Sequence, residues 1–376
     1  MSHSVRETIA VVSILGEPRN PKTWTHAPSS IMQAIEKLGY SVAGFDSGIR
    51  NRYLHMGLAK LNQFAGARQL DLRRTRMFRV ICAVKALTKS RSVDAKRVLH
   101  MAGPYEMLWF KLNTGTKHYL YCDATWDLWI KHYRRTGRRA IDASAAMDKL
   151  DQRCYQQMEH IFSASEYVRE NLTEQYKIDS GKVTIVGMGV GKIRPFAGKK
   201  DYCNGHILFV AKQGVDGHKG GPLLCEAFKI AQEKIPDLKL VIVGGEEHRD
   251  LVNGIPNVTV TGYISWDELQ QLYEKASLFA MPALYEPWGQ VYVEALQCKT
   301  PILGLNRNSL PEITDGGKYG ILIDEPTPQA VAEGIIWAFE HPEKLEQMAL
   351  EGQTFCLDRY SWDSVAEKMC EVIFRA

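Results

Sequence analysis

Short apolar runs alternate with longer segments of helical spacing through the first half of the chain. The runs are rich in β-branched residues, which favours strands, and in the segments between them apolar side chains recur every three or four residues. This strand–helix alternation predicts an α/β fold with a doubly wound parallel sheet. The expected strands are Ile9–Leu15, Arg97–Met101, Tyr119–Cys122, His160–Ala164 and Lys182–Val186, and the expected helices include Ile31–Leu38 and Ala146–Met158.

The same alternation resumes in the second half and is more regular there. It predicts a second Rossmann-like unit, followed by a terminal helix at Ser361–Phe374. The expected strands are His206–Ala211, Leu238–Gly244, Val258–Thr261, Leu278–Met281, Pro301–Leu305 and Ile321–Ile323, with helices at Pro222–Lys234, Trp266–Lys275, Gln290–Gln297 and Gln329–Glu340.

Gly, Lys and Pro interrupt the pattern between the two halves, within Gly187–Asn204. A chain of 376 residues is too long for one compact core, which also favours two domains. We expect an N-terminal domain at 1–190, a linker at 191–204 and a C-terminal domain at 205–358. The terminal helix, within 359–376, is assigned to the first domain.

The composition, with 45% hydrophobic and 24% charged residues, is that of a soluble globular protein. No run of about 18 apolar residues predicts a membrane span. The N-terminus, MSHSVRETIAVVSIL, lacks a signal-peptide cleavage pattern and is interpreted as the first strand. The eight cysteines form no C-x-x-C pair, so buried free thiols are expected rather than a zinc site. We therefore expect a cytoplasmic protein.

Charge is distributed unevenly along the chain. Residues 1–190 carry 29 Lys/Arg against 17 Asp/Glu, and the remainder carries 18 against 26. Within 50–97, thirteen basic residues accompany only two acidic ones and flank the apolar run Val80–Leu87. This region is interpreted as a basic, amphipathic surface that binds an anionic membrane or an anionic acceptor. The alternative is a solvated helical face. Nucleic acid is not an expected partner, because no nucleic-acid-binding motif accompanies the charge.

Two lysines follow the strand at His206–Ala211. Lys212 ends the strand, and Lys219 comes just before Gly220-Gly221-Pro222, which marks a helix start. Ammonium groups beside a helix N-terminus form an anion site, as a departing diphosphate requires. The alternative is that both lysines are solvated surface residues.

Two glutamates eight residues apart flank the strand-to-helix turn EPWGQ. Glu286 lies in the loop after a strand, and Glu294 lies on the helix that Pro287-Trp288-Gly289 opens. Carboxylates on either side of the backbone N–H groups of 288–291 can accept hydrogen bonds from the vicinal hydroxyls of a sugar or a ribose.

Gly16 directly follows the first strand and would let the backbone approach a phosphate closely. No G-x-G-x-x-G accompanies it, which argues against an NAD or FAD site.

The pieces FVAK, HKGG, LVIVGG, VTGYISWDEL, EPWGQVYVEAL and TPILGLNRNSLPEI occur in this order. In order and spacing the sequence resembles the retaining glycosyltransferase family 4, which implies the GT-B fold of two facing Rossmann-like domains. The resemblance covers the C-terminal half nearly end to end, and HIFSASEYVRENLTEQY and RYSWDSVAEKM extend it to other parts of the chain.

The resemblance implies that the domain at 1–190 is on the acceptor side and that the domain at 205–358 binds the donor. It also implies a role for each matching position. Lys212 and Lys219 would hold the donor diphosphate, with Gly16 facing it from the other domain. Glu294 would hold the ribose, and the backbone near Tyr263 and Ile264 would meet the base. The donor-sugar hydroxyls would be contacted by Glu286 and by the backbone at Trp288, Gly289, Gln290 and Val291.

Three positions depart from the family pattern. Lys299 replaces a usual Gly, and Ala102 stands where many members carry a His that orients the donor sugar. His100, two residues earlier, is expected to be packed rather than catalytic. Asp123, after the next strand, either takes part of that His role or caps the following helix.

The implied activity is transfer of a sugar from a nucleoside-diphosphate sugar to a hydroxyl of a glycan, glycolipid or small molecule, as in polysaccharide biosynthesis, with retention of configuration. Front-face attack is expected, because the departing phosphate can accept the proton. No metal or other cofactor is expected. The alternatives are a nucleotide-sugar epimerase or phosphorylase on the same fold, and a non-catalytic sugar-nucleotide-binding protein.

Overall fold

The computed structural model describes residues 7–49, 76–101, 103, 115–135, 145–211, 217–245 and 248–375. The chain divides into two compact units. The first comprises Met1–Met188 and Trp362–Ala376, and the second comprises Gly189–Ser361. Residues 191–204, predicted as a linker, belong to the second unit, where Lys200 Nζ donates to the carbonyl oxygens of Tyr273 and Ala276.

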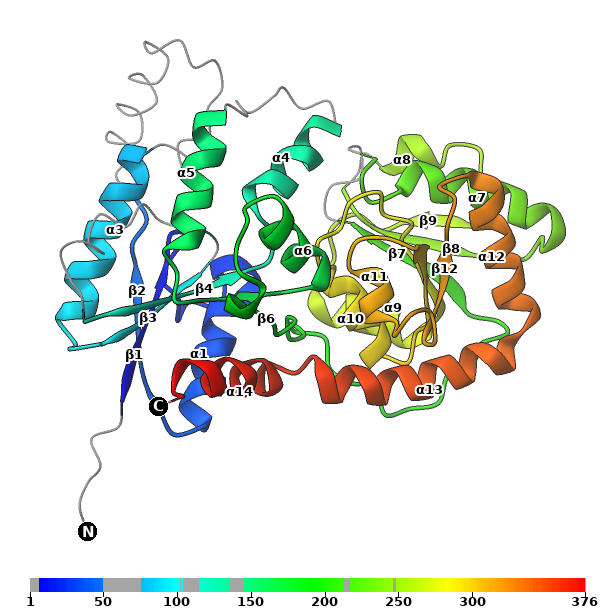
Figure 1. Cartoon of the computed structure of the whole chain (residues 1–376). Coiled ribbons are helices and arrows are strands. Elements are labelled where there is room, and N and C mark those ends of the chain that lie inside the picture. Colours follow the sequence, from blue (N-terminus) through cyan, green and yellow to red (C-terminus); the bar gives the residue numbers. More distant parts are fainter. Residues whose placement is uncertain are drawn as a thin grey trace. The chain divides into compact units, whose positions relative to one another are not determined.

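The first unit contains a parallel sheet in the order β2-β1-β3-β4-β5-β6, six-stranded over the described residues (Figure 1). Because the order reverses beside β1, the carboxyl ends of β1 and β3 form a topological switch point, where open α/β sheets bind ligands. The strands are β1 (Thr8–Ser13), β2 (Ser41–Asp46), β3 (Arg97–Met101), β4 (Lys117–Cys122), β5 (His160–Ser163) and β6 (Val183–Ile185).

The second unit has a parallel sheet of the same kind, in the order β12-β11-β10-β7-β8-β9 for the residues described. Here the order reverses at β7, so the switch point lies between the carboxyl ends of β7 and β10. The strands are β7 (His206–Ala211), β8 (Leu240–Gly244), β9 (Val258–Val260), β10 (Ala276–Ala280), β11 (Ile302–Leu305) and β12 (Gly320–Ile323).

Helices connect the strands of each sheet. Those of the first unit are η1 (Thr23–His26), α1 (Ala27–Lys37), α3 (Arg76–Arg91), α4 (Trp126–Arg135), α5 (Ala145–Gln156), α6 (Glu166–Glu174), η4 (Ser180–Lys182) and α14 (Trp362–Ile373). Those of the second are α7 (Gly221–Lys234), α8 (His248–Leu251), α9 (Trp266–Lys275), α10 (Gln290–Gln297), α11 (Leu310–Ile313), α12 (Pro328–Glu340) and α13 (Pro342–Arg359).

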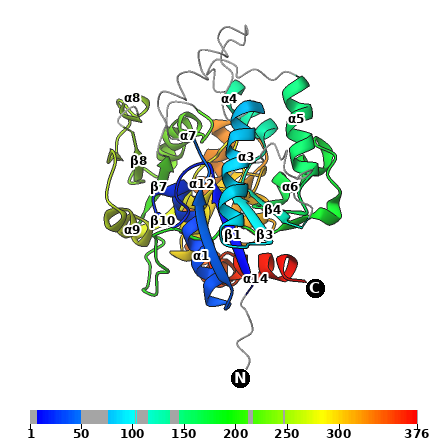
Figure 2. The ribbon, with the colours of Figure 1, turned by 90° about the vertical axis from the view of Figure 1, so that its left-hand side faces the viewer.

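The terminal helix α14 packs on α1 inside the first unit (Figures 1 and 2). Its buried positions Val365, Met369 and Ile373 recur at helical spacing, which gives it one apolar face. At its end the Arg97 side chain donates to the Ile373 carbonyl at 2.8 Å. The last helix therefore completes the first unit rather than the second.

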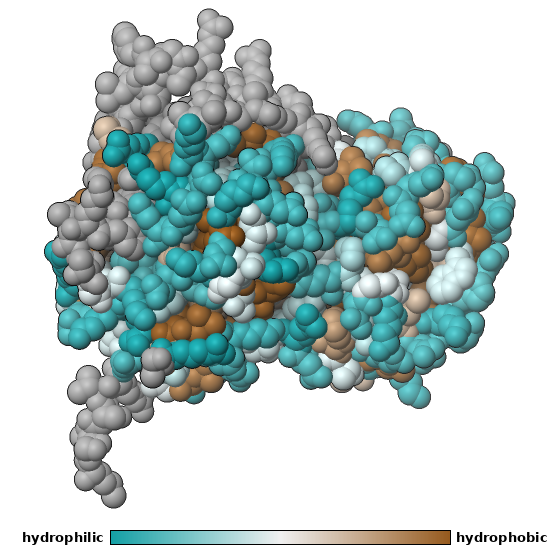
Figure 3. Space-filling view, in the orientation of Figure 1, coloured by the Kyte–Doolittle hydropathy of each residue, from teal (hydrophilic) through white to brown (hydrophobic). Residues whose placement is uncertain are grey.

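The surface shown in Figure 3 is mostly hydrophilic, and its hydrophobic areas are separate from one another. Large exposed apolar side chains are likewise spread over several elements, for example Met77 and Val84 on α3 and Leu350 on α13. The searched helices of the described chain include none long and apolar enough to cross a membrane. The strand ends are a better guide to the functional site than apolar surface is.

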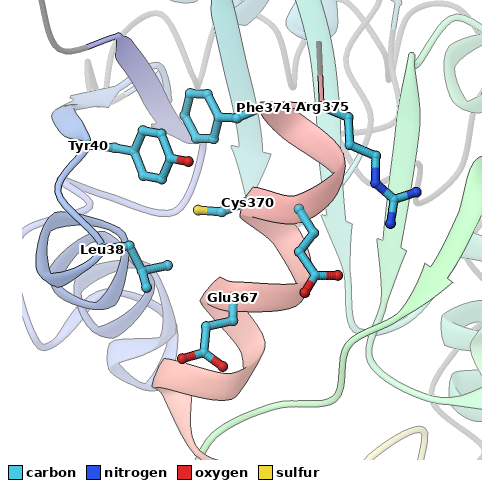
Figure 4. Close-up of a pocket in the computed structure, with 7 residues that line it drawn as sticks. Leu38, Tyr40, Glu367, Cys370, Phe374 and Arg375 are labelled. Atoms are coloured by element: carbon cyan, nitrogen blue, oxygen red, sulfur yellow. The ribbon is translucent and has the colours of Figure 1, made fainter. Parts of the chain in front are cut away.

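A groove of about 380 Å³ lies between α14, the end of α1 and the start of β2 (Figure 4). The Tyr40 and Phe374 rings stack at one end, with centroids 3.8 Å apart, and Glu367 and Cys370 line the helix side. Tyr40 directly precedes β2, so the groove lies at the amino end of this strand, away from the edge where parallel sheets bind ligands.

Most predicted elements are confirmed: β3, β7, α9 and α10 have the expected bounds, and the other predicted elements lie within a few residues of theirs. The predicted buried free thiols are confirmed except at Cys203, which is exposed. The prediction omitted strand β2 and, among the α-helices, α4, α6, α8, α11 and α13.

Candidate active site

The switch point of the second sheet brings Lys219 and Glu286 together. Lys219 follows β7, Glu286 follows β10, and these two strands are neighbours. The Lys219 ammonium forms an ion pair with Glu286 Oε2. The side chains are 27% and 11% exposed, so the pair is largely withdrawn from water yet open to a ligand. Burial lowers the pKa of Lys219 to about 8, while the contacting carboxylate favours its charged form.

Backbone contacts hold the two loops in this position. The Leu284 N–H donates to the His218 carbonyl at 2.7 Å. Gly220 caps α7 with φ 79°, and a Cβ there would lie 2.1 Å from the Pro282 carbonyl oxygen. Only glycine allows both the backbone angle and the close approach. The N-terminus of α7 is thereby fixed beside the loop after β10.

Buried hydrogen bonds also hold the turn that carries Glu286. The Ser309 hydroxyl donates to the carbonyls of Glu286 and Trp288 at 3.2 and 2.6 Å. Gly289 caps α10 with φ 82°, and a Cβ there would lie 2.5 Å from Tyr292 and 2.9 Å from Glu286 Cγ. Gln290 and Val291, which follow, form the first turn of α10, whose backbone N–H groups create a partial positive charge.

Glu294 lies one turn further along α10 and is buried. The Tyr273 hydroxyl donates to its Oε2 at 3.0 Å. Burial raises the pKa of Glu294 to about 7. This carboxyl does not contact Lys219 through any hydrogen bond or ion pair seen among the described residues.

Tyr263 and Ile264 lie in the loop between β9 and α9, at the carboxyl end of β9. The Tyr263 ring is 68% exposed. The Gly244 N–H donates to the Gly262 carbonyl at 3.2 Å, which ties this loop to the end of β8. The segment is accessible to a planar ligand.

In the first unit, Gly16 and Asp123 lie at the carboxyl edge of the sheet, after β1 and β4. Gly16 has φ 151°. Burial raises the pKa of Asp123 to about 6, although the neighbouring Trp24 side chain and the Ala124 backbone N–H favour the charged form. Thr125 Oγ1, not Asp123, accepts from the Leu128 N–H and so caps α4.

His100 is packed inside the first sheet, as expected. Its Nε2 lies 3.0 Å from Nδ1 of His118, and burial and this neighbour lower the pKa of His100 well below its ordinary value. At the first departure, Lys299 adopts φ 54°, a left-handed angle that glycine takes more readily. Its ammonium donates to the Gly198 carbonyl at 2.9 Å.

Some predicted site residues are thus joined directly and others are not. Lys219 touches Glu286, whereas Glu294 lies deeper on α10. Lys212 and Ala102 lie outside the described residues. Sequence patterns did not single out Tyr273, Ser309 or Trp24. Each belongs to a different element from the group that it holds. Ser309 lies in the piece TPILGLNRNSLPEI, which supported the resemblance but gave this residue no role.

Residues 204–355 match the family glycosyl transferases group 1. They form a glycosyl transferases group 1 domain. This domain contains β7 to β12, and with them Lys219, Glu286 and Glu294. The ion pair at its switch point is therefore part of a glycosyltransferase domain.

The relatives of this group 1 domain include glycosyltransferases of known and unknown substrate. An uncharacterised glycosyltransferase of Methanocaldococcus jannaschii is 28% identical over 44% of this chain and 44% of its own length. The GDP-mannose-dependent alpha-(1-6)-phosphatidylinositol monomannoside mannosyltransferase of Mycolicibacterium smegmatis is 25% identical over 41% of this chain and 44% of its own length. The matched region thus spans less than half of either relative.

Solved structures match almost the whole chain. A glycosyltransferase from Rickettsia africae has a TM-score of 0.66 at 14% identity, and a sucrose-phosphate synthase from Thermosynechococcus elongatus has 0.69 at 16%. Each match covers 98% of both chains. The protein has the two-domain α/β GT-B fold, as predicted.

Proposed function

We propose that the protein is a retaining glycosyltransferase that transfers a sugar from a nucleoside-diphosphate sugar to an acceptor hydroxyl. The observation that carries this proposal is the Lys219–Glu286 pair at the switch point of a group 1 domain. A cation and a hydroxyl-binding carboxylate in one place match the two ends of a sugar diphosphate. The free thiols suit the reducing cytoplasm, where we propose that the enzyme acts.

In this proposal, Lys219 and Glu286 bind different parts of the donor. Lys219 and the N-terminus of α7 bind the diphosphate, with Lys212 as a second cation. Glu286 and the first turn of α10 bind sugar hydroxyls. Glu294 accepts from the ribose, and the loop at Tyr263 and Ile264 meets the base. The Tyr273 hydroxyl holds the buried Glu294 carboxyl in place for this contact.

The reaction proceeds by front-face attack. The acceptor oxygen forms the new bond to the anomeric carbon on the side from which the diphosphate leaves, so configuration is retained. The acceptor proton passes to the departing phosphate oxygen, and no protein base is needed. Lys219 stabilises the negative charge that develops on the leaving group.

Lys219→Ala tests this assignment. Removal of one donor that stabilises developing charge should lower the turnover number about 100-fold or more. Lys229→Ala is the matched control, because Lys229 lies on α7, the helix that follows Lys219, but is exposed and pairs with Glu226. Turnover would be measured as release of nucleoside diphosphate with acceptor present. Wild-type turnover in the Lys219 variant would overturn the proposal.

Product analysis separates this reaction from its alternatives. An epimerase alters the donor sugar without an acceptor, a phosphorylase releases sugar phosphate, and a non-catalytic binding protein leaves the donor intact. The proposed enzyme forms a new glycoside only when an acceptor is added.

We further propose that catalysis needs no divalent metal, because Lys219 and two helix N-termini supply positive charge at the diphosphate. Activity should persist after treatment with EDTA and removal of the chelated metal. Loss of activity that Mg²⁺ or Mn²⁺ restores would contradict this.

Contact of the region 50–97 with anionic membrane stays a prediction, and its first part, 50–75, lies outside the described residues. On α3, Met77 and Val84 are exposed. Arg79, however, is buried and paired with Asp151, and Lys85 donates to the Gly48 carbonyl. Fewer basic side chains of α3 are therefore available to lipid than the sequence suggested.

A further inference from the structure

A hydrogen bond from Tyr273 joins helix α9 to the buried carboxyl on α10. The Tyr273 hydroxyl donates to Oε2 of Glu294 at 3.0 Å, and its contact with the Val291 carbonyl, at 3.4 Å, is longer. The described residues show no hydrogen bond to the other carboxyl oxygen, Oε1, and Glu294 is 5% exposed. One oxygen is therefore held by the protein, and the other keeps its capacity to accept from a ligand.

Tyr273 is itself fixed by the surrounding structure. Its carbonyl accepts hydrogen bonds from Lys200 Nζ at 2.7 Å and from Thr300 Oγ1 at 3.0 Å, which anchor the last turn of α9. Its ring is completely buried, with its centroid 6.0 Å from that of Phe279 on β10. Because the ring has little freedom to move, its hydroxyl determines the direction in which the Glu294 carboxyl points.

The hydroxyl also affects the charge of the carboxyl. Burial raises the pKa of Glu294 to about 7, and the hydrogen bond from Tyr273 opposes this by favouring the charged form. Burial, with the neighbouring carboxylate, raises the pKa of Tyr273 well above its ordinary value, so the phenol stays a neutral donor. A neutral donor stabilises the carboxylate without cancelling its charge, which leaves a strong acceptor for hydroxyl groups.

Other titratable groups lie close to this hydrogen bond. Burial, more than the nearby carboxylates, raises the pKa of the Cys298 thiol to about 12, and burial also raises the pKa of the Cys356 thiol on α13. Both thiols therefore stay uncharged near neutral pH. Burial lowers the pKa of Lys200 to about 7, but its ammonium contacts Tyr273 through the backbone carbonyl. Replacement of the tyrosine hydroxyl leaves that contact in place.

We propose that Tyr273 is a positioning residue that makes the site selective for ribose: its hydroxyl holds Oε2 of Glu294, so that Oε1 accepts a hydrogen bond from a ribose hydroxyl. The inference rests on the proposed function, in which Glu294 binds the ribose. It adds the residue through which this contact distinguishes ribose from deoxyribose.

The first test compares ribose with deoxyribose by titration calorimetry on the full chain. UDP, GDP and ADP are measured first, and the one that binds most tightly is compared with its 2′-deoxy and 3′-deoxy counterparts. The wild type should bind at least one deoxy form about tenfold more weakly, or worse, because a hydrogen bond to a charged group is lost. Tyr273→Phe should reduce this preference to about threefold or less and leave the affinity for the deoxy form nearly unchanged.

The second test is the pH dependence of the same preference, which a purely structural role of Tyr273 would not alter. The ratio of the two dissociation constants is used, because the diphosphate ionises in the same way in both ligands. In the wild type the preference for ribose should increase as the pH rises through about 7, where Glu294 becomes charged. In Tyr273→Phe this increase should move to higher pH, since the hydrogen bond that favours the charged form is gone.

Tyr292→Phe is the matched control. Tyr292 is also buried, and its ring centroid is likewise 6.0 Å from that of Phe279. Its hydroxyl, however, donates to the Met281 carbonyl at 2.9 Å and not to Glu294. This variant should keep the wild-type preference for ribose and the wild-type pH profile. Thermal melting of both variants shows that they are folded.

A double variant tests whether Tyr273 acts through the carboxyl. In a Glu294→Gln background, Tyr273→Phe should change the preference for ribose no further, because the group that it positions has already been altered. An additional loss of preference in the double variant, of the same size as in Tyr273→Phe alone, would overturn the inference.

The inference and the proposed function fail in different ways. If the wild type prefers ribose and Tyr273→Phe keeps both this preference and the pH profile, only the role of Tyr273 is rejected. The same change of profile in Tyr292→Phe would also reject it. Failure of UDP, GDP and ADP to bind the wild type would instead overturn the proposed function, and the inference with it.

Discussion

At the scale of single residues, Glu294 makes the stability of the folded chain depend on pH. Burial raises the pKa of its carboxyl to about 7, from an ordinary value near 4.5. The folded chain therefore holds this proton more tightly than the unfolded chain does. The resulting stabilisation is complete below about pH 4.5 and is lost as the pH rises through about 7.

Glu294→Gln should remove this pH dependence. At about 1.4 kcal/mol for each pH unit between the two pKa values, the wild type should lose roughly 3 kcal/mol relative to the variant between pH 4.5 and 8. For a unit of this size that corresponds to a relative fall in melting temperature of about 6–12 °C, measured by calorimetry at both pH values. A difference between the two proteins that is the same at both pH values would contradict the buried-carboxyl assignment.

Only part of the candidate site could be predicted from the sequence. Lys219, Glu286 and Glu294 stand in runs whose position after strands marks them as site candidates. Tyr273 and Trp24 could not be found in this way, because only tertiary packing brings them beside Glu294 and Asp123. The ion pair itself also depends on the adjacency of β7 and β10, which strand order in the sequence does not give.

At the scale of elements, the junction of the loops after β7 and β10 depends on Gly220. Its φ of +79° and the 2.1 Å approach of a built Cβ to the Pro282 carbonyl are separate constraints. Gly254 has nearly the same angle, +78°, but open space around it. A substitution at Gly254 therefore tests the effect of the backbone angle alone, and the same substitution at Gly220 adds the steric conflict with Pro282.

Gly254→Ala should cost about 1 kcal/mol of stability, through the left-handed angle alone, and leave nucleotide affinity unchanged. Gly220→Ala should cost more and raise the dissociation constant for nucleoside diphosphate about tenfold or more, since α7 or the loop after β10 must shift. Calorimetric melting and titration calorimetry measure both effects. Equal affinity in the two variants would show that the loop contact does not position the anion site.

Two of the elements missing from the prediction, β2 and α13, have a weak hydropathy pattern. β2, SVAGFD, is an edge strand with a single buried position, so alternation is hardly visible. The buried face of α13 contains Ala349, Gly352 and Cys356, and Gly352 packs against Tyr319 and Leu296. Small residues let a helix approach its neighbours closely, but they do not stand out as an apolar stripe.

At the scale of the whole molecule, each unit has its own sheet and core. The second unit is continuous in sequence, and it contains the entire group 1 domain. The first unit is assembled from two segments, because α14 covers the buried face of α1. Residues 1–188 alone would leave apolar side chains of α1 uncovered.

A fragment of residues 189–361 should therefore melt cooperatively and bind nucleoside diphosphate, although without turnover. A fragment of residues 1–188 should aggregate or melt at lower temperature than the same segment rejoined to 362–376 by a flexible linker. Circular dichroism and titration calorimetry would check both statements. An unfolded 189–361 fragment would show that the second unit depends on the first.

In sequence, the second unit is an insertion within the first, between Met188 and Trp362. Grafting a homologous segment between these two junctions would exchange the whole group 1 domain while the native first unit, helix α14 included, remained intact. If the second unit binds the donor nucleotide as we propose, chimeras of this kind should change the nucleotide used and keep the acceptor, and the chain would then be a modular scaffold for building new glycosides.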